Sequence, residues 1–166
     1  MMNFDSPTFR LRRSVLFMPG DNQRALAKAR DLPADALIFD LEDAVAPAAK
    51  EEARGRAAEA LRAGGYGGRE LVMRINALDG PWGEADLAVA AGLPIDALLL
   101  PKVESAEEVA RAAASLGELG APARLALWCM LETPRGILAA SAIAAASPRL
   151  AALVAGTSDL TKDLHA

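Results

Sequence analysis

The stretch that decides the fold is ALIFDLED, residues 36–43, an apolar run that ends in acidic residues. A strand with one face in water alternates apolar and polar residues, whereas a strand covered on both faces reads as a nearly unbroken apolar run. Comparable runs occur at residues 14–18, 71–75, 97–101, 124–131 and 153–156. The sequence therefore predicts six strands of a sheet that is buried on both faces.

Longer segments rich in Ala, Glu and Arg separate these runs and have helical character. They cover residues 22–30, 48–63, 82–91, 106–119 and 135–146. Ser105, followed by Glu108, resembles a capping box and favours a helix start at that point. Because the strand ends recur at intervals near the roughly 30 residues of a βαβ unit, we expect parallel strands joined by crossover helices.

The predicted fold class is α/β, a TIM-type (β/α)8 barrel. No linker or shift in composition divides the chain, so residues 1–166 are predicted to form a single barrel domain. A complete barrel uses eight strands and roughly 250 residues, so this chain is expected to cover about six βα units and to be truncated at its C-terminus. An open six-stranded sheet is the alternative that the pattern leaves open.

Composition argues against several classes of partner. The net charge of −4 and the pI near 5.1 leave no basic surplus for nucleic acid. Residues 1–13 contain no apolar export signal, and no run approaches the roughly 20 apolar residues of a membrane span. The single cysteine, Cys129, excludes an internal disulfide and lies in an apolar run. We expect a cytoplasmic protein that binds neither nucleic acid nor membrane.

Polar residues follow nearly every predicted strand. In a parallel barrel the C-terminal ends of the strands form one rim, and barrel enzymes keep their active sites there. The residues at this rim are Asp40, Glu42, Asp43, Arg74, Asn76, Lys102, Glu132, Ser158 and Asp159. The rim is therefore the predicted site of chemistry.

Glu132 and Asp159 end consecutive strands, which lie about 4.8 Å apart in a sheet. Both carboxylates could reach one cation, and magnesium typically takes one or two protein carboxylates beside waters and a chelating substrate. In the alternative interpretation each acid only caps the helix that follows it. Spacing alone leaves both interpretations open.

Arg74 is well shaped for bidentate binding of a carboxylate or a developing oxyanion. The alternative is a structural ion pair with the acidic loop, and both can hold together. Asp40, Glu42 and Asp43 are predicted to orient Arg74 or metal-bound waters.

Lys102 could form a Schiff base if its pKa were lowered. The acids around it favour the charged ammonium instead, so pairing with acids or contact with a phosphate is the preferred interpretation. Pro19 and Gly20, with Arg12 and Arg13 before that strand, could shape an anion-binding loop, although Pro-Gly is more often a plain turn.

Six motifs in order resemble one family, the citrate lyase β-subunits, malyl-CoA and citramalyl-CoA lyases and related metal-dependent hydroxy-oxo-acid aldolases of the HpcH/HpaI superfamily. The motifs are RSVLFMPG at 13–20, DLEDAV at 40–45, RIN at 74–76, LPKVE at 100–104, MLETPR at 130–135 and GTSDL at 156–160. Members of this family continue beyond this point with two more strands and a C-terminal segment that covers the active site in several of them.

The resemblance implies a magnesium-dependent carbon–carbon lyase. In this assignment Glu132 and Asp159 hold Mg²⁺, a 2-oxo acid chelates the ion, and Arg74 stabilises the enolate of an acyl thioester. The substrate-binding set is Arg74, Glu132, Pro19 and Gly20. The substrate would be a 3-hydroxyacyl thioester of citryl, malyl or citramalyl type, carried on CoA or an acyl-carrier protein. A homo-oligomer is expected.

Two other functions are compatible with these motifs. One is a magnesium-dependent aldolase that acts on free 4-hydroxy-2-oxo acids. The other is a non-catalytic subunit that binds a thioester or its carrier.

Overall fold

A computed structural model describes residues 10–166, so the first nine residues of the predicted domain lie outside the described part. Within it, six strands form one open sheet in chain order. They are β1 (Val15–Pro19), β2 (Ala36–Asp40), β3 (Glu70–Arg74), β4 (Ala97–Leu100), β5 (Ala126–Leu131) and β6 (Leu150–Ala155). Every pair of neighbours is parallel, which confirms the six predicted βα units.

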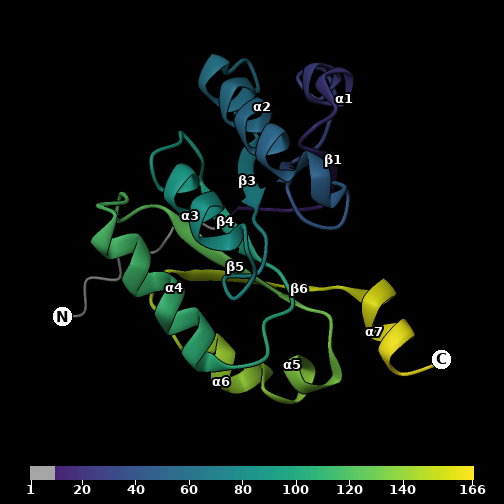
Figure 1. The fold of residues 1–166 in the computed structure, drawn as a ribbon, viewed down its shortest axis with the longest axis vertical. Helices are drawn as coiled ribbons and strands as arrows, with labels where there is room; N and C mark the ends of the chain where they lie inside the picture. Colours follow the sequence, from purple (N-terminus) through teal and green to yellow (C-terminus); the bar gives the residue numbers. More distant parts are fainter. Residues whose placement is uncertain (1–9) are drawn as a thin grey trace.

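Helices connect the strands along the chain. They are α1 (Gln23–Lys28), a 3-10 turn η1 (Pro47–Ala49), α2 (Lys50–Ala63), α3 (Gly83–Ala91), α4 (Ala106–Glu118), α5 (Pro134–Leu138), α6 (Ala140–Ala144) and α7 (Thr157–Asp163). Figure 1 shows α2, α3 and α4 packed in sequence against the sheet, with α7 beyond the end of β6. Helix α4 begins at the predicted cap, because the Ser105 hydroxyl accepts a hydrogen bond from the Glu108 amide.

Two predicted elements differ most from the observed ones. The expected helix 135–146 is two short helices, with Ala139 (φ −87°, ψ 0°) as the C-cap of α5 and the N-cap of α6. Ile143 is buried and Leu138 is exposed. Strand β6 begins at Leu150, earlier than the expected residue 153. Leu150 pairs with Leu127, and a register shift follows before Ala152 pairs with Trp128.

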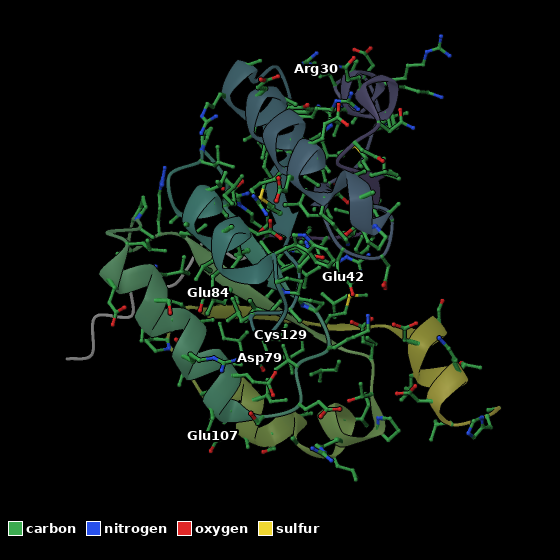
Figure 2. The ribbon with its side chains drawn as sticks, viewed as in Figure 1. Arg30, Glu42, Asp79, Glu84, Glu107 and Cys129 are labelled. Carbon is green, nitrogen blue, oxygen red and sulfur yellow. The ribbon has the colours of Figure 1, made fainter. Side chains whose placement is uncertain are left out.

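Alternate strand residues face two different layers. One face of the sheet packs on the helices and includes Leu37, Phe39, Met73 and Cys129. Figure 2 places Cys129 near the middle of the molecule, and burial raises the pKa of its thiol to about 12. The thiol therefore stays protonated and behaves as a core residue, as the sequence predicted.

The inner face of the sheet carries the side chains that lead to the rim. It contains a second apolar cluster made of Ala36, Ile38, Val72, Ala97, Leu99, Trp128 and Met130. Asp40, Arg74 and Glu132 each follow a member of this cluster by two residues. Because side chains two apart point to the same face, these three polar groups continue the inner face at the C-terminal ends of the strands. Among residues 10–166, none of the helices is long and apolar enough to cross a membrane.

Candidate active site at the rim of the sheet

A cleft of about 320 Å³ opens at the C-terminal ends of the strands. This volume lies within the roughly 300–1,000 Å³ of typical small-molecule sites. The residues that line it are Phe17, Asp43, Arg74, Met130, Glu132, Ala155, Gly156, Thr157, Ser158 and Asp159. Side chains from both ends of the described chain therefore meet in one place.

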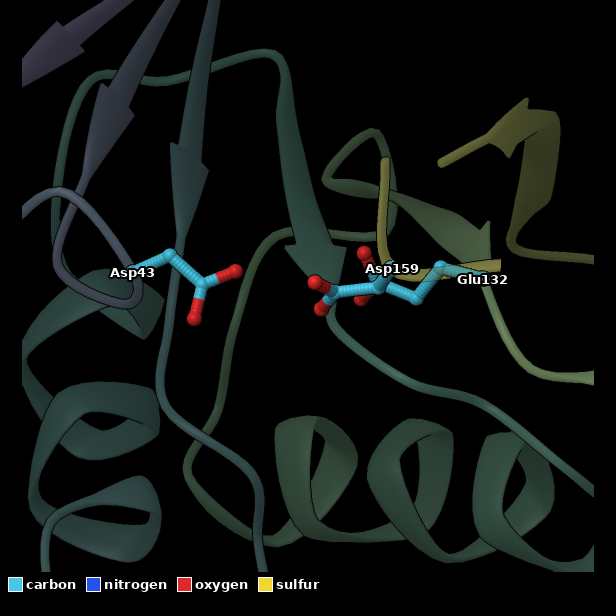
Figure 3. Close-up of side chains that lie close together, drawn as sticks. All are labelled: Asp43, Glu132 and Asp159. Atoms are coloured by element: carbon cyan, nitrogen blue, oxygen red, sulfur yellow. The ribbon is translucent and has the colours of Figure 1, made fainter. Parts of the chain in front are cut away.

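Three carboxylates come together in this cleft. One oxygen from each of Asp43, Glu132 and Asp159 lies within 4.8 Å of the other two, and we call these residues the carboxylate cluster. Figure 3 shows Asp43, on the loop after β2, directing its carboxylate toward Glu132 and Asp159. The sequence had assigned Asp43 only to orientation of Arg74 or of metal waters, and the structure makes it a third candidate ligand.

The alternative that Glu132 and Asp159 are helix caps does not hold. Thr133 caps α5, because its hydroxyl accepts a hydrogen bond from the Gly136 amide. Helix α7 begins after Gly156 and has no side-chain cap. Both carboxylates thus remain available to the cleft.

Glu132 is almost completely buried, with 2% of its surface exposed. Its Oε1 accepts a hydrogen bond of 2.9 Å from the backbone amide of Lys102. Burial raises the pKa of Glu132, and the Lys102 amide and ammonium offset this only in part. A cation bound beside Glu132 would compensate its buried charge, and a set of carboxylate oxygens is the chemistry that magnesium prefers.

The raised pKa of Glu132 predicts that metal affinity depends on pH. A proton and a cation compete for this carboxylate, so magnesium binding should weaken as pH falls below the pKa of Glu132. The expected loss is about tenfold in affinity for each pH unit in that range. Calorimetric titration of magnesium across the acidic range measures this. An affinity that stays constant while the protein remains folded would exclude Glu132 as a ligand.

Gly156 allows Glu132 to reach the cluster. A Cβ atom at position 156 would lie 2.5 Å from Glu132 Cβ and 2.7 Å from Glu132 Oε2. Real carbon atoms do not approach so closely, so Gly156→Ala must displace the Glu132 side chain. We expect magnesium affinity to fall roughly 10- to 100-fold, the usual cost of disturbing the surroundings of a ligand.

Gly55→Ala is the matched control for this substitution. Gly55 lies within α2, and a Cβ there would meet nothing within 4 Å. It should stabilise the helix by roughly 0.5–1 kcal/mol and leave magnesium affinity unchanged. Equal magnesium affinities for Gly156→Ala and wild type would show that the close approach of Gly156 to Glu132 has no role in metal binding.

Arg74 is held by the acidic loop after β2. Its Nε donates to Asp40 Oδ1 at 2.7 Å, and its Nη2 bonds the other oxygen of the same carboxylate. Nη1 lies 3.0 Å from a Glu42 oxygen and 3.7 Å from an Asp43 oxygen. Burial alone lowers the pKa of Arg74, but the bonds to Asp40 and the nearby acids raise it overall. The guanidinium is therefore permanently charged, with one edge fixed by Asp40.

The loop that carries Glu42 and Asp43 is held by a residue that sequence reasoning missed. Lys50 is buried, and its ammonium donates to the carbonyls of Leu41 and Glu42 at 2.8 and 2.6 Å. Asn76 donates to the Leu41 carbonyl as well. Figure 2 shows Glu42 at the centre of the molecule, where this loop meets the sheet ends. No sequence spacing indicates these contacts, since Lys50 begins α2 and Asn76 follows β3, whereas the carbonyls belong to the loop after β2.

Lys102 lies between the acids of the rim. Its ammonium is 2.6 Å from a Glu42 oxygen, 3.4 Å from Asp43 and 3.2 Å from Asp159. Burial lowers its pKa, but these carboxylates outweigh burial and raise the pKa above the ordinary value. The predicted pairing with acids is present, and a neutral amine for Schiff-base chemistry is disfavoured.

The predicted anion-binding loop needs correction. Arg12 and Arg13 lie at the opposite end of β1 from Pro19 and Gly20, where they pair with Glu70 and Asp35. Gly20 packs tightly instead, since a Cβ there would lie 2.8 Å from Leu41 Cδ2. Pro19 and Gly20 do not line the cleft. Their role in substrate binding stays a prediction.

Comparison with known proteins agrees with this arrangement. The family model described as HpcH/HpaI aldolase/citrate lyase matches residues 13–166. The chain is 47% identical over 152 residues to a (3S)-malyl-CoA thioesterase of Cereibacter sphaeroides, covering 92% of this chain and 51% of that protein. It is 38% identical over 163 residues to the citrate lyase subunit beta of Escherichia coli, covering 94% and 53%.

A solved structure gives the same result for the fold. The citrate lyase beta subunit of Mycobacterium tuberculosis, complexed with oxaloacetate and magnesium, superposes with a TM-score of 0.72 at 36% identity. The match covers 91% of this chain and 60% of that one. The chain thus spans about half the length of the curated relatives it matches. These matches, together with the six-stranded sheet and the rim residues, show that the chain belongs to the HpcH/HpaI aldolase/citrate lyase family.

Proposed function

We propose that this chain carries the metal-holding part of a magnesium-dependent carbon–carbon lyase that cleaves a 3-hydroxyacyl thioester to a 2-oxo acid and an acyl thioester. The observation that carries the proposal is that the carboxylate cluster and Arg74 line the same cleft. Asp43, Glu132 and Asp159 would hold the ion. A bound magnesium ion would supply Lewis-acid polarisation of the oxygens of the 2-oxo acid.

The residues of this chain suit the charge that develops in such a cleavage. A base takes the hydroxyl proton, the bond between the carbinol carbon and the thioester α-carbon breaks, and the bonding electron pair passes to the thioester as an enolate. A proton then returns to the α-carbon to give the acyl thioester. Arg74 offers a fixed positive charge at the cleft wall for this oxyanion, since Asp40 holds its other edge. Preorganised groups of this kind act where charge develops. The Phe17 ring lies 5.2 Å from the guanidinium carbon of Arg74, and Arg74 Nη1 donates to Met130 Sδ at 3.7 Å, so both residues also fix the position of Arg74.

The names of relatives support the substrate class. One relative is named a malyl-CoA thioesterase, and a structural neighbour is described with oxaloacetate and magnesium. We therefore propose small 2-oxo acids and an acyl thioester as partners, on CoA or a carrier protein. A single barrel domain, a homo-oligomer and a cytoplasmic location remain predictions.

The name of the malyl-CoA thioesterase raises a second candidate function, thioester hydrolysis. One assay separates hydrolysis from carbon–carbon cleavage. With malyl-CoA, carbon–carbon cleavage yields glyoxylate and acetyl-CoA, whereas hydrolysis yields malate and free CoA. Glyoxylate formed without free thiol supports the lyase. Free thiol formed without glyoxylate would establish the thioesterase instead.

Two further substrates complete this assay. Turnover restricted to free 4-hydroxy-2-oxo acids would make the protein an aldolase. Thioester binding without any turnover, retained in Glu132→Ala, would make it a binding subunit.

A further inference from the structure

Lys102 has an unusual backbone for a residue with a side chain. Its φ is +48°, in the left-handed region that residues other than glycine seldom adopt. In this conformation the Lys102 amide faces Glu132 Oε1 while the side chain reaches Glu42 and Asp159. Such strained positions are concentrated at functional sites. This conformation lets Lys102 contact Glu132 after β5, Asp159 after β6 and Glu42 on the loop after β2 at the same time.

The Lys102 ammonium lies among the groups that would hold a metal. It contacts two members of the carboxylate cluster, Asp43 at 3.4 Å and Asp159 at 3.2 Å, and the same residue's amide bonds the third. Its shortest contact, 2.6 Å, is to Glu42, which is outside the cluster. A bound magnesium ion keeps ligand oxygens at about 2.0–2.1 Å, much closer than these ammonium contacts.

The charge balance of the rim indicates what the ammonium does. Five carboxylates, Asp40, Glu42, Asp43, Glu132 and Asp159, lie near three cations, Arg74, Lys102 and the buried Lys50 below the acidic loop. Arg74 makes two bonds to Asp40 and lies 3.0 Å from Glu42 and 3.7 Å from Asp43, whereas Lys102 lies near both Asp43 and Asp159. Lys102 is therefore the cation that offsets repulsion between Asp43 and Asp159.

We propose that the Lys102 ammonium is a built-in counter-cation of the carboxylate cluster, which a divalent metal displaces from Asp43 and Asp159, leaving it paired with Glu42 alone. The inference rests on the proposed metal site and goes beyond it. It means that the cluster is assembled before the metal arrives, and that metal affinity is set by competition with an internal charge. If Lys102 only held the ligand residues in place, removing its charge would weaken metal binding instead of strengthening it.

The test begins with the wild-type chain and magnesium alone. Lysine reactivity is measured with limiting acetic anhydride and mass spectrometry, with and without magnesium. Displacement predicts that Lys102 acetylation becomes at least severalfold faster at saturating magnesium, while exposed Lys28 is unchanged. Slower or equal acetylation of Lys102, in protein that calorimetry shows to bind magnesium, overturns the proposal and leaves the metal site standing.

Two variants give the complementary measurement. Lys102→Met keeps the apolar stem and removes the charge, whereas Lys102→Arg keeps the charge. Magnesium should bind Lys102→Met at least tenfold more tightly than wild type, and Lys102→Arg within threefold of wild type. The metal-free Lys102→Met protein should melt at a lower temperature and recover with magnesium. Weaker binding by Lys102→Met contradicts the proposal, and absence of magnesium binding in wild type overturns it together with the metal site.

Discussion

Replacing Glu132 by glutamine is expected to abolish magnesium binding and to leave the metal-free protein at least as stable as wild type. Glutamine keeps the shape of the side chain and an oxygen that can accept the Lys102 amide hydrogen bond. It removes the charge of a carboxylate whose pKa is raised by burial. Activity should fall at least about 100- to 1,000-fold, the usual cost of losing a preorganised electrostatic group.

The stability part of this prediction depends on pH. The pKa of Glu132 is higher in the folded than in the unfolded chain, so folding takes up a proton between the two values. The contribution of Glu132 to stability is therefore fully present below its pKa in the unfolded chain and is lost as pH rises through its pKa in the folded chain. Glu132→Gln should remove this loss in metal-free protein. In EDTA, the melting temperatures of wild type and Glu132→Gln should therefore be equal at acidic pH, and wild type should melt at the lower temperature as pH rises to neutral.

Glu107→Gln is the control for this series. Glu107 is exposed on α4, far from the labelled Glu42 in Figure 2. It should change neither magnesium binding nor the pH profile. A Glu132→Gln protein that binds magnesium like wild type would remove Glu132 from the metal site.

Replacing Arg74 by methionine is expected to cost both stability and rate. Asp40 is 1% exposed and would lose both guanidinium bonds, leaving an uncompensated buried charge. Removal of one partner of such a pair typically costs about 3–5 kcal/mol. The rate should fall about 100- to 1,000-fold, because the developing oxyanion loses its cation. Urea unfolding and steady-state kinetics measure the two effects separately.

The double variant Arg74→Met/Asp40→Asn separates the structural role of Arg74 from its chemical one. A neutral asparagine carries no buried charge, so most of the lost stability should return. The activity should not return, because the cleft still lacks the guanidinium. Recovery of both would make Arg74 purely structural, which is the ion-pair interpretation that the sequence left open.

The sheet and most of the rim could be predicted because both depend on local patterns. Continuous apolar runs mark strands covered on both faces, and the polar residues that follow them share one end of a parallel sheet. Asp40, Arg74 and Glu132 fall on the inner face because each lies two residues beyond an inner-face residue. Such alternation can be read from the sequence alone.

The remaining features depend on contacts between distant segments. Asp43 turns toward Glu132 because Lys50 and Asn76 hold the loop through backbone carbonyls, which no spacing rule indicates. The early start of β6 follows from a register shift against β5. The sequence combines Arg12 and Arg13 with Pro19 and Gly20 in one loop because they flank the same predicted strand, but β1 holds the two pairs at opposite ends.

The most direct test of the account is calorimetric titration of magnesium, with oxaloacetate present, into wild type and into the Glu132→Ala/Asp159→Ala variant. A magnesium site at this rim predicts metal-dependent binding of the 2-oxo acid to wild type and none to the variant. Equal binding by both proteins, or oxaloacetate binding that needs no metal, would contradict a magnesium site at this rim.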